Sequence, residues 1–169
     1  RILDIGTGSG CIAITLKQNI ENALVTALDI SDEALEIAKT NASIKNIEID
    51  FVKADIRIPE QWPAGPFDII VSNPPYVRES EKELMKPNVL EHEPHTALFV
   101  SDEQPLVFYE AIAKLAFQSL TAQGKLYFEI NENLQDDLKL LLQNIGFQSI
   151  EFKHDLNKKV RMLCCSINI

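Results

Sequence analysis

The sequence has 169 residues, 46% of them hydrophobic, and a formal net charge of −9. This length fits one domain with its own core, and no apolar run approaches the roughly 20 residues that cross a bilayer, so we expect a cytoplasmic protein. The acidic charge disfavours binding to a phosphate backbone, and three cysteines (Cys11, Cys164 and Cys165) are too few and wrongly spaced for a disulfide framework or a zinc site.

The chain opens with an apolar strand over residues 2–5, a glycine-rich turn over 6–10, and a helix from Cys11. This order is typical of a nucleotide site at the start of a βαβ unit. Cys11 stands where the dinucleotide fingerprint requires a glycine or alanine, and Asp4 would repel a pyrophosphate but attract a cation. These features favour S-adenosyl-L-methionine, which carries an amino group and a sulfonium, bound by Asp4, Gly6, Thr7, Gly8, Ser9 and Gly10.

Two further strands place acidic residues where a nucleoside would lie. The strand over 24–28 ends at Asp29, which is positioned to accept both ribose hydroxyls, with Ile30 next to it. The strand over 49–52 leads to Asp55, which would bond the adenine amino group, and Ile56, which would pack on the ring. An ordinary loop carboxylate that caps local N–H groups is almost equally well supported for Asp55.

The fourth strand, residues 67–71, leads into the stretch Ser-Asn-Pro-Pro-Tyr. Two prolines end the strand and fix two φ angles, so the chain leaves the sheet as a stiff loop. This loop, which we call the amide clamp, offers a side-chain oxygen from Asn73, backbone acceptors at Pro74 and Pro75, and the flat ring of Tyr76. A planar group bearing NH2, such as a primary amide or adenine N6, fits these acceptors; the alternative is a plain proline turn.

The second half of the chain has less chemical signal. Residues 77–104 predict a long functional loop; His92 and His95 lie in it without a further ligand cluster, so we expect no metal. We predict a helix from Pro105, a strand over 126–130, a helix over 134–145, a strand from Phe147, and an antiparallel hairpin partner over 160–167. A small basic cluster, Lys158, Lys159 and Arg161, fits a solvated hairpin.

Together these elements predict a Rossmann-like α/β domain with a seven-stranded, mostly parallel sheet and an antiparallel last strand. Ligands of such sheets lie beyond the carboxyl ends of the strands. The glycine turn, Asp29, Asp55 and Asn73 each follow a strand, so four independent observations indicate one site.

These motifs resemble the class I methyltransferases with an Asn-Pro-Pro-Tyr motif, and among them the HemK/PrmC protein-glutamine N5-methyltransferases that modify peptide chain release factors. The resemblance covers essentially the whole chain and includes a downstream loop with Glu93, Pro94, Thr96, Ala97 and Leu98. It implies that residues 1–169 are the catalytic domain; family members usually add a small N-terminal helical domain, which we do not expect within these residues. A departure is Ile56, where some relatives place tryptophan.

The resemblance implies methyl transfer from S-adenosyl-L-methionine to the N5 amide of a glutamine, that of the Gly-Gly-Gln motif of release factors, with S-adenosyl-L-homocysteine as product. Catalytic roles fall on Asn73, Pro74 and Tyr76, and Pro75 completes the substrate site; Asn73 is also expected to contact the cofactor. We expect a monomer that acts on release factors and has no nucleic-acid or membrane partner. Three alternatives remain open: an adenine-N6 methyltransferase of DNA or RNA, a glutamine methyltransferase of a ribosomal protein, and a cofactor-binding module without catalysis.

Overall fold

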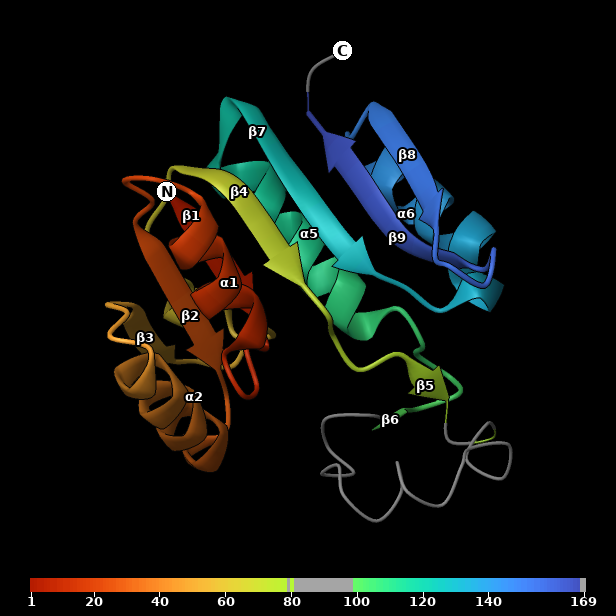
Figure 1. The fold of residues 1–169 in the computed structure, drawn as a ribbon. Coiled ribbons are helices and arrows are strands. Elements are labelled where there is room, and N and C mark those ends of the chain that lie inside the picture. Colours follow the sequence, from red (N-terminus) through yellow and green to blue (C-terminus); the bar gives the residue numbers. More distant parts are fainter. Residues whose placement is uncertain (79, 81–98, 168–169) are drawn as a thin grey trace.

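The computed structural model describes residues 1–78, 80 and 99–167, and a seven-stranded sheet forms its centre (Figure 1). The sheet order is β3-β2-β1-β4-β7-β9-β8. The strands are β1 (Ile2–Ile5), β2 (Val25–Asp29), β3 (Asp50–Lys53), β4 (Phe67–Ser72), β7 (Leu120–Glu129), β8 (Ser149–His154) and β9 (Val160–Ser166). The first five are parallel, and β9 is antiparallel to both neighbours, which confirms the predicted sheet and hairpin.

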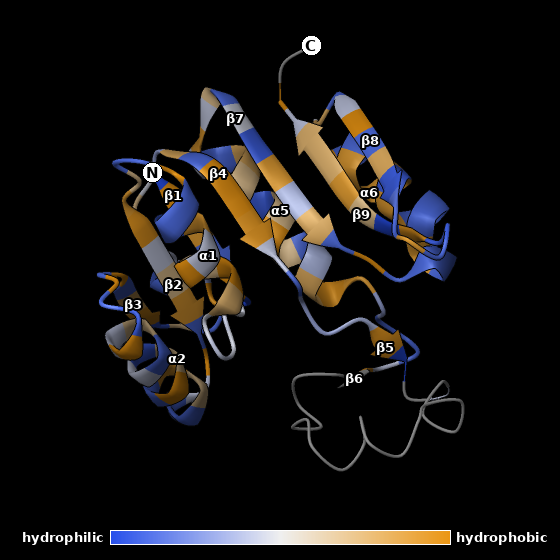
Figure 2. Cartoon of the chain, in the orientation of Figure 1, coloured by the Kyte–Doolittle hydropathy of each residue, from blue (hydrophilic) through white to orange (hydrophobic). Residues whose placement is uncertain are grey.

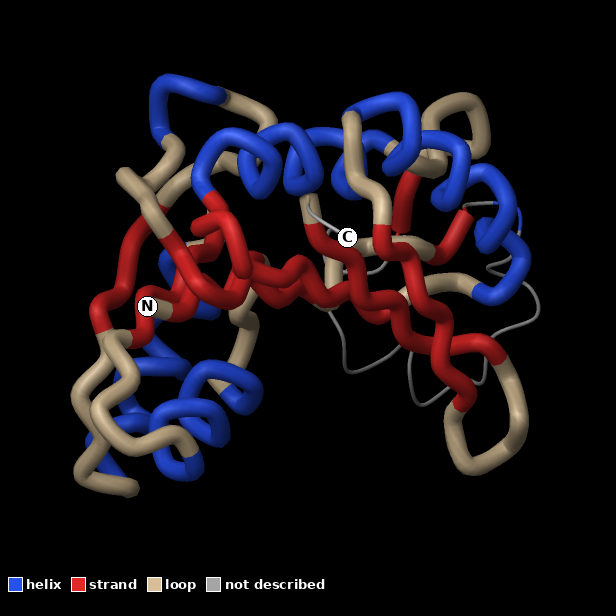
Figure 3. Tube along the Cα trace, turned by 90° about the horizontal axis from the view of Figure 1, so that it is seen from above, coloured by secondary structure: helices blue, strands red, loops and turns tan. Residues whose placement is uncertain are grey.

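Helices cover both faces of the sheet (Figure 3). The α-helices are α1 (Cys11–Asn19), α2 (Asp32–Ile44), α5 (Val107–Ser119) and α6 (Gln135–Ile145), and short 3-10 turns are η1 (Pro59–Gln61) and η3 (Glu132–Leu134). On one face, Ala13 of α1 packs in a cluster with Ile2 and Val25. On the other, α5 and α6 enclose the larger core with residues of β1, β4, β7 and β9. The sheet is therefore held between two apolar layers.

The side-chain periods explain these elements. Helix α5 buries Tyr109, Ile112, Ala113 and Ala116, which recur at helical spacing on one stripe. Strand β7 alternates instead, with Leu126 buried and its neighbour Lys125 exposed. Figure 2 shows this alternation as changes between orange and blue along β7.

Three predicted boundaries were wrong by two residues or more. Strand β8 begins at Ser149 and not at Phe147. Strand β7 begins at Leu120 and not at 126, because Leu120 pairs with Phe67 before a register shift, although residues 121–125 have no strand-like apolar pattern. Helix α5 begins at Val107, two residues after the predicted start at Pro105. For β7, tertiary pairing, which the local sequence does not encode, set the boundary, whereas α5 follows a local turn in which the Val107 amide donates to the Gln104 carbonyl at 3.2 Å.

The ends of the predicted long loop form two short strands that the sequence did not predict. Strands β5 (Val77–Arg78) and β6 (Phe99–Val100) pair in parallel as a separate two-stranded sheet. The rest of the loop, residues 79 and 81–98, lies outside the described residues. It contains the histidines and the downstream family motif: His92, Glu93, Pro94, His95, Thr96, Ala97 and Leu98.

Candidate functional site

Four neighbouring strands bring the predicted site residues to one side of the sheet (Figure 1). This side, formed by the carboxyl ends of the parallel strands, is called the edge below. In the order β3-β2-β1-β4, the residues at or just beyond the carboxyl ends are Asp55, Asp29, Gly6 and Asn73. Adjacent strands lie about 4.8 Å apart, so these four positions span about 14 Å. The edge is therefore suited to an elongated ligand whose parts contact successive strand ends.

The glycine turn adopts a conformation that requires glycine at three positions. Gly6, Gly8 and Gly10 have φ of +69°, +54° and +82°, a region that side chains with a Cβ rarely enter. The amides of Gly6 and Thr7 both donate to the carbonyl of Leu28 in β2, at 2.8 and 3.0 Å. A Cβ on Gly6 or Gly8 would meet no atom within 4 Å. The turn thus leaves open space along its outer side.

Asp4 lies beneath the turn, fully buried. Its Oδ2 accepts hydrogen bonds from the Thr7 hydroxyl at 2.6 Å and the Ala13 amide at 3.1 Å. Burial raises the pKa of Asp4 to about 6, against these two hydrogen bonds and with a smaller contribution from Asp29. Its Oδ1 is buried and has no hydrogen-bond partner among the described residues. Through Oδ2 the carboxylate therefore connects the turn to the start of α1. Its Oδ1 can still accept a hydrogen bond.

Asp29 joins the turn to the second helix. Its Oδ2 accepts from the Gly8 amide at 2.9 Å and its Oδ1 from the Ser31 amide at 3.0 Å. Ser31 in turn caps α2 by accepting from the Ala34 amide. Each carboxylate oxygen keeps a second lone pair, so two further donors fit here. The adjacent Ile30 is 55% exposed and offers an apolar surface beside them.

Asp55 is held by Arg57. The guanidinium donates from Nε to Oδ1 at 2.9 Å and from Nη2 to Oδ2 at 2.7 Å, and this bonding lowers the pKa of Asp55. Such a bidentate pair occupies the lone pairs on one side of the carboxylate. Ile56 is 7% exposed and belongs to the large core cluster, and its carbonyl accepts the Trp62 indole N–H at 2.7 Å. Exposed Ile30 therefore offers more apolar surface at this edge than Ile56.

The amide clamp begins directly beside the glycine turn. Ser72 pairs in register with Ile5, and the Ser72 hydroxyl donates to the Ile5 carbonyl at 2.7 Å. Gly6 directly follows the end of β1, and Asn73 directly follows the end of β4. The two loops therefore leave the sheet side by side. Asn73 is exposed, whereas Pro74 is buried and Pro75 half-buried. The Asn73 amide is thus open to a ligand on a rigid, anchored backbone.

Tyr76 closes the clamp and is fixed by β7. Its hydroxyl donates to Glu129 Oε1 at 2.8 Å, and its ring is half-buried against the core. Burial first, and then Glu129, raise the pKa of Tyr76 to about 12, while Arg161 acts in the opposite direction. The phenol is therefore neutral at physiological pH.

Sequence reasoning missed Ser72, Glu129 and Asn131 as supports of this edge. Glu129 is the last residue of β7, and Asn131, two residues later, donates to the Tyr76 carbonyl at 3.4 Å. The rule that ligands gather at carboxyl strand ends, applied to the fifth parallel strand, would have selected Glu129. The sequence predicts a strand over 126–130, which places Glu129 in the strand interior and not at its end.

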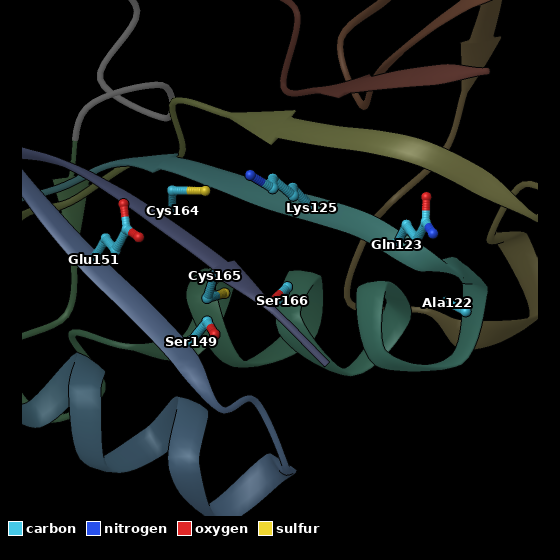
Figure 4. A pocket seen from close by; sticks show the side chains of 8 residues that line it. All are labelled: Ala122, Gln123, Lys125, Ser149, Glu151, Cys164, Cys165 and Ser166. Carbon is cyan, nitrogen blue, oxygen red and sulfur yellow. The ribbon is translucent and has the colours of Figure 1, made fainter. Parts of the chain in front are cut away.

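Two pockets lie away from this edge. The first, about 320 Å³, is lined by eight residues of β7, β8 and β9 (Figure 4): Ala122, Gln123, Lys125, Ser149, Glu151, Cys164, Cys165 and Ser166. The second, about 700 Å³, includes Leu24, Ile49 and Asp50, at the amino ends of β2 and β3. Neither pocket is lined by a predicted site residue. We therefore assign the site to the carboxyl ends of the strands.

Within residues 1–78, 80 and 99–167, no group of three or more histidine, cysteine or acidic side chains is arranged to hold a metal ion. Among the same residues, no helix has the length and apolar character needed to cross a membrane. The acidic residues of the site are instead committed to backbone amides and to Arg57: Asp4, Asp29 and Asp55.

Comparison with known proteins gives the family. A model described as the methyltransferase small domain matches residues 1–96, which include the glycine turn, Asp29, Asp55 and the amide clamp. Proteins named release factor glutamine methyltransferase are 48% identical to this chain in Flavobacterium psychrophilum and 46% in Bacteroides thetaiotaomicron, each over 163 residues. These alignments cover 96% of this chain but 57% and 59% of the two relatives, so it spans less than two thirds of their length.

Solved structures agree with the fold. A methyltransferase from Pyrococcus furiosus has a TM-score of 0.74 at 23% identity, covering 99% of this chain and 75% of that one. Magnesium protoporphyrin IX methyltransferase from Synechocystis, solved with bound SAM, has a TM-score of 0.61 at 19% identity, covering 98% and 68%. At such identities the likeness concerns the fold alone.

The family match covers more than half of this chain and every strand end at which the predicted site residues lie. The names of the more similar relatives agree with the resemblance that the motifs indicated. On this ground the chain belongs to the methyltransferase small domain family.

Proposed function

We propose that this chain transfers a methyl group from S-adenosyl-L-methionine to the N5 amide of a glutamine, that of the Gly-Gly-Gln motif of peptide chain release factors. The observation that carries this proposal is the exposed Asn73 amide on a rigid double-proline loop, directly beside the open glycine turn. The names of the similar relatives support the choice of acceptor.

The residues at the sheet edge fit the cofactor. Gly6 and Gly8 leave space along the turn, Asp29 has free lone pairs for two ribose hydroxyls, and Ile30 offers an apolar surface for a base. Asp4 keeps a buried, unpartnered oxygen and a negative charge beneath the turn, which favours a ligand carrying positive charge above it. When bound, the cofactor would supply an electrophilic methyl group on a sulfonium. We assign Asp55 and Ile56 minor contacts, because Arg57 and the core already engage them.

The amide clamp would bind and activate the acceptor. A glutamine amide nitrogen is a poor nucleophile, because its lone pair is delocalised into the carbonyl. If Asn73 Oδ1 and the Pro74 carbonyl accept its two N–H bonds, positive charge that develops on nitrogen is stabilised where it appears. Proline at 74 and 75 removes competing N–H donors and fixes the loop, so orientation is set before the acceptor arrives. The ring of Tyr76 would give the planar amide a flat surface.

Substitution of Asn73 tests this role. Asn73→Ala in the intact protein should lower kcat by about 100-fold or more, because one acceptor for the charge on nitrogen is lost. The cofactor Kd should stay within about tenfold, because Asn73 lies on the clamp side of the edge. Methyl transfer from labelled cofactor gives kcat, and calorimetry gives Kd. Asn144→Ala, an exposed asparagine of α6, is the matched control; unchanged kcat in Asn73→Ala would reject the role.

The acceptor is identified by locating the label. Release factor, ribosomal protein and nucleic acid should be offered separately, with a release factor whose Gly-Gly-Gln glutamine is changed to asparagine as control. We expect label on the wild-type release factor only. Label on adenine would favour the rival clamp function, in which Tyr76 stacks on a flipped base; the net charge of −9 disfavours that rival.

A further inference from the structure

The end of strand β7 anchors Tyr76 at two points. The Tyr76 hydroxyl donates to Glu129 Oε1 at 2.8 Å, and the Tyr76 carbonyl accepts from Asn131 Nδ2 at 3.4 Å. Glu129 is itself fixed, because its backbone carbonyl accepts the hydroxyl of fully buried Tyr109 at 3.0 Å. The neighbouring Ile130 amide donates to the Arg161 carbonyl of β9 at 2.9 Å. Strands β7 and β9 therefore form a rigid support under the clamp.

This support matters because of the prolines. Pro74 and Pro75 have no N–H, so the loop cannot be tied down through their amides. Ser72 holds the loop at its start, through the Ile5 carbonyl at 2.7 Å. Tyr76 holds it at its end, and the strongest of its bonds is to a carboxylate, since hydrogen bonds to charged acceptors are shorter and stronger than neutral ones. Glu129 therefore fixes the hydroxyl end of the Tyr76 ring, and Arg161 also lies close enough to the phenol to lower its pKa.

We propose that Glu129 is a positioning residue of the methyl transfer: it holds the ring of Tyr76 so that the clamp acceptors meet the substrate amide at a fixed angle. This inference rests on the proposed function. It differs from a general-base role, in which Glu129 would take a proton from the substrate; here Glu129 Oε1 accepts the Tyr76 hydroxyl. Glutamine at 129 keeps an acceptor oxygen without the basicity, so the two roles predict opposite behaviour of one variant.

The test combines variants at both positions in the intact protein. Tyr76→Phe and Glu129→Met should each lower kcat about tenfold, with the cofactor Kd unchanged within threefold. The double variant should be no slower than either single variant, because both remove the same bond. Glu129→Gln should keep at least a third of the wild-type kcat, with the same pH profile. Loss of 100-fold or more in Glu129→Gln, together with loss of the acidic limb of the pH profile, would overturn the positioning role in favour of a base.

Two further measurements show whether a loss of kcat comes from positioning of Tyr76 or from general loss of stability. They also test the positioning role independently of the proposed function. Ile112→Val removes a buried methyl group of α5 outside the clamp support and should lower thermal stability without lowering kcat at a temperature where the protein is folded. NMR of 13C-labelled tyrosine rings reads out Tyr76 without any acceptor: its signals should shift or broaden in Glu129→Met but not in Glu129→Gln. Unchanged signals in Glu129→Met would reject the inference, whereas an inactive wild type with the expected signals would reject only the proposed function.

Discussion

Asp4 shows how a single residue couples the site to pH. Its pKa is raised from 3.8 to about 6, mainly by burial, so the folded protein holds a proton that the unfolded chain has already released. Above the unfolded value the unfolded state therefore binds fewer protons, and stability falls as pH rises from about 4 to about 6, then levels off. A shift of about two units corresponds to about 3 kcal/mol. The buried carboxylate is thus costly at neutral pH unless positive charge lies nearby.

Asp4→Asn removes this titration. The difference in unfolding free energy, variant minus wild type, should increase by about 3 kcal/mol between pH 4 and pH 7, because only the wild type loses stability there. Urea unfolding at a series of pH values measures it. Glu36→Gln removes an exposed carboxylate of α2 and controls for the loss of one charge. Parallel curves for Asp4→Asn and wild type would contradict the assigned pKa shift.

Among the elements, the glycine turn contains one glycine that packs against the fold, Gly10, and one that faces open space, Gly8. A Cβ on Gly10 would lie 3.0 Å from the Ala38 Cβ of α2, whereas a Cβ on Gly8 would meet open space. Both positions have positive φ, which costs alanine about 1 to 2 kcal/mol. The turn is therefore packed against α2 on one side and open on the side we assign to the cofactor.

The two alanine substitutions should differ accordingly. Gly10→Ala should lose the larger share of stability, about 2 kcal/mol or more, because contact with Ala38 adds to the backbone strain. Gly8→Ala should lose about 1 kcal/mol but weaken cofactor binding at least tenfold, because its methyl group enters the ligand space. Denaturant unfolding and calorimetry measure the two quantities. Equal cofactor Kd in Gly8→Ala and wild type would place the ligand elsewhere.

At the scale of the whole molecule, the cofactor would join four strands that otherwise contact one another only pairwise. Ligand at 100 times its Kd stabilises the folded state by about 2.7 kcal/mol, which for a domain of this size raises Tm by about 5 to 11 °C. Asp29→Ala should abolish most of this rise, since Asp29 holds both the turn and the proposed ribose contacts. Asn73→Ala should keep it. Differential scanning calorimetry with and without S-adenosyl-L-methionine tests both, and an undiminished rise in Asp29→Ala would contradict the ribose assignment.

Much of this arrangement followed from the sequence. Glycines at 6, 8 and 10 predicted the turn because only glycine enters positive φ easily, and the apolar runs before Asp29 and Asn73 predicted buried parallel strands. Parallel strands end at one edge, so the meeting of these residues could be inferred without coordinates. Local chemistry and periodicity were sufficient wherever a residue acts through its own conformation or its place along a strand.

Only the tertiary structure decided what each side chain contacts. Nothing near Asp4 in the sequence says that it is buried beneath the turn, nor that Arg57 holds Asp55, nor that the core takes up Ile56. The bond from Tyr76 to Glu129 joins the clamp loop to the end of β7, 53 positions away in the sequence. Such contacts depend on strand order, register and packing between distant segments, and a local pattern carries no record of them.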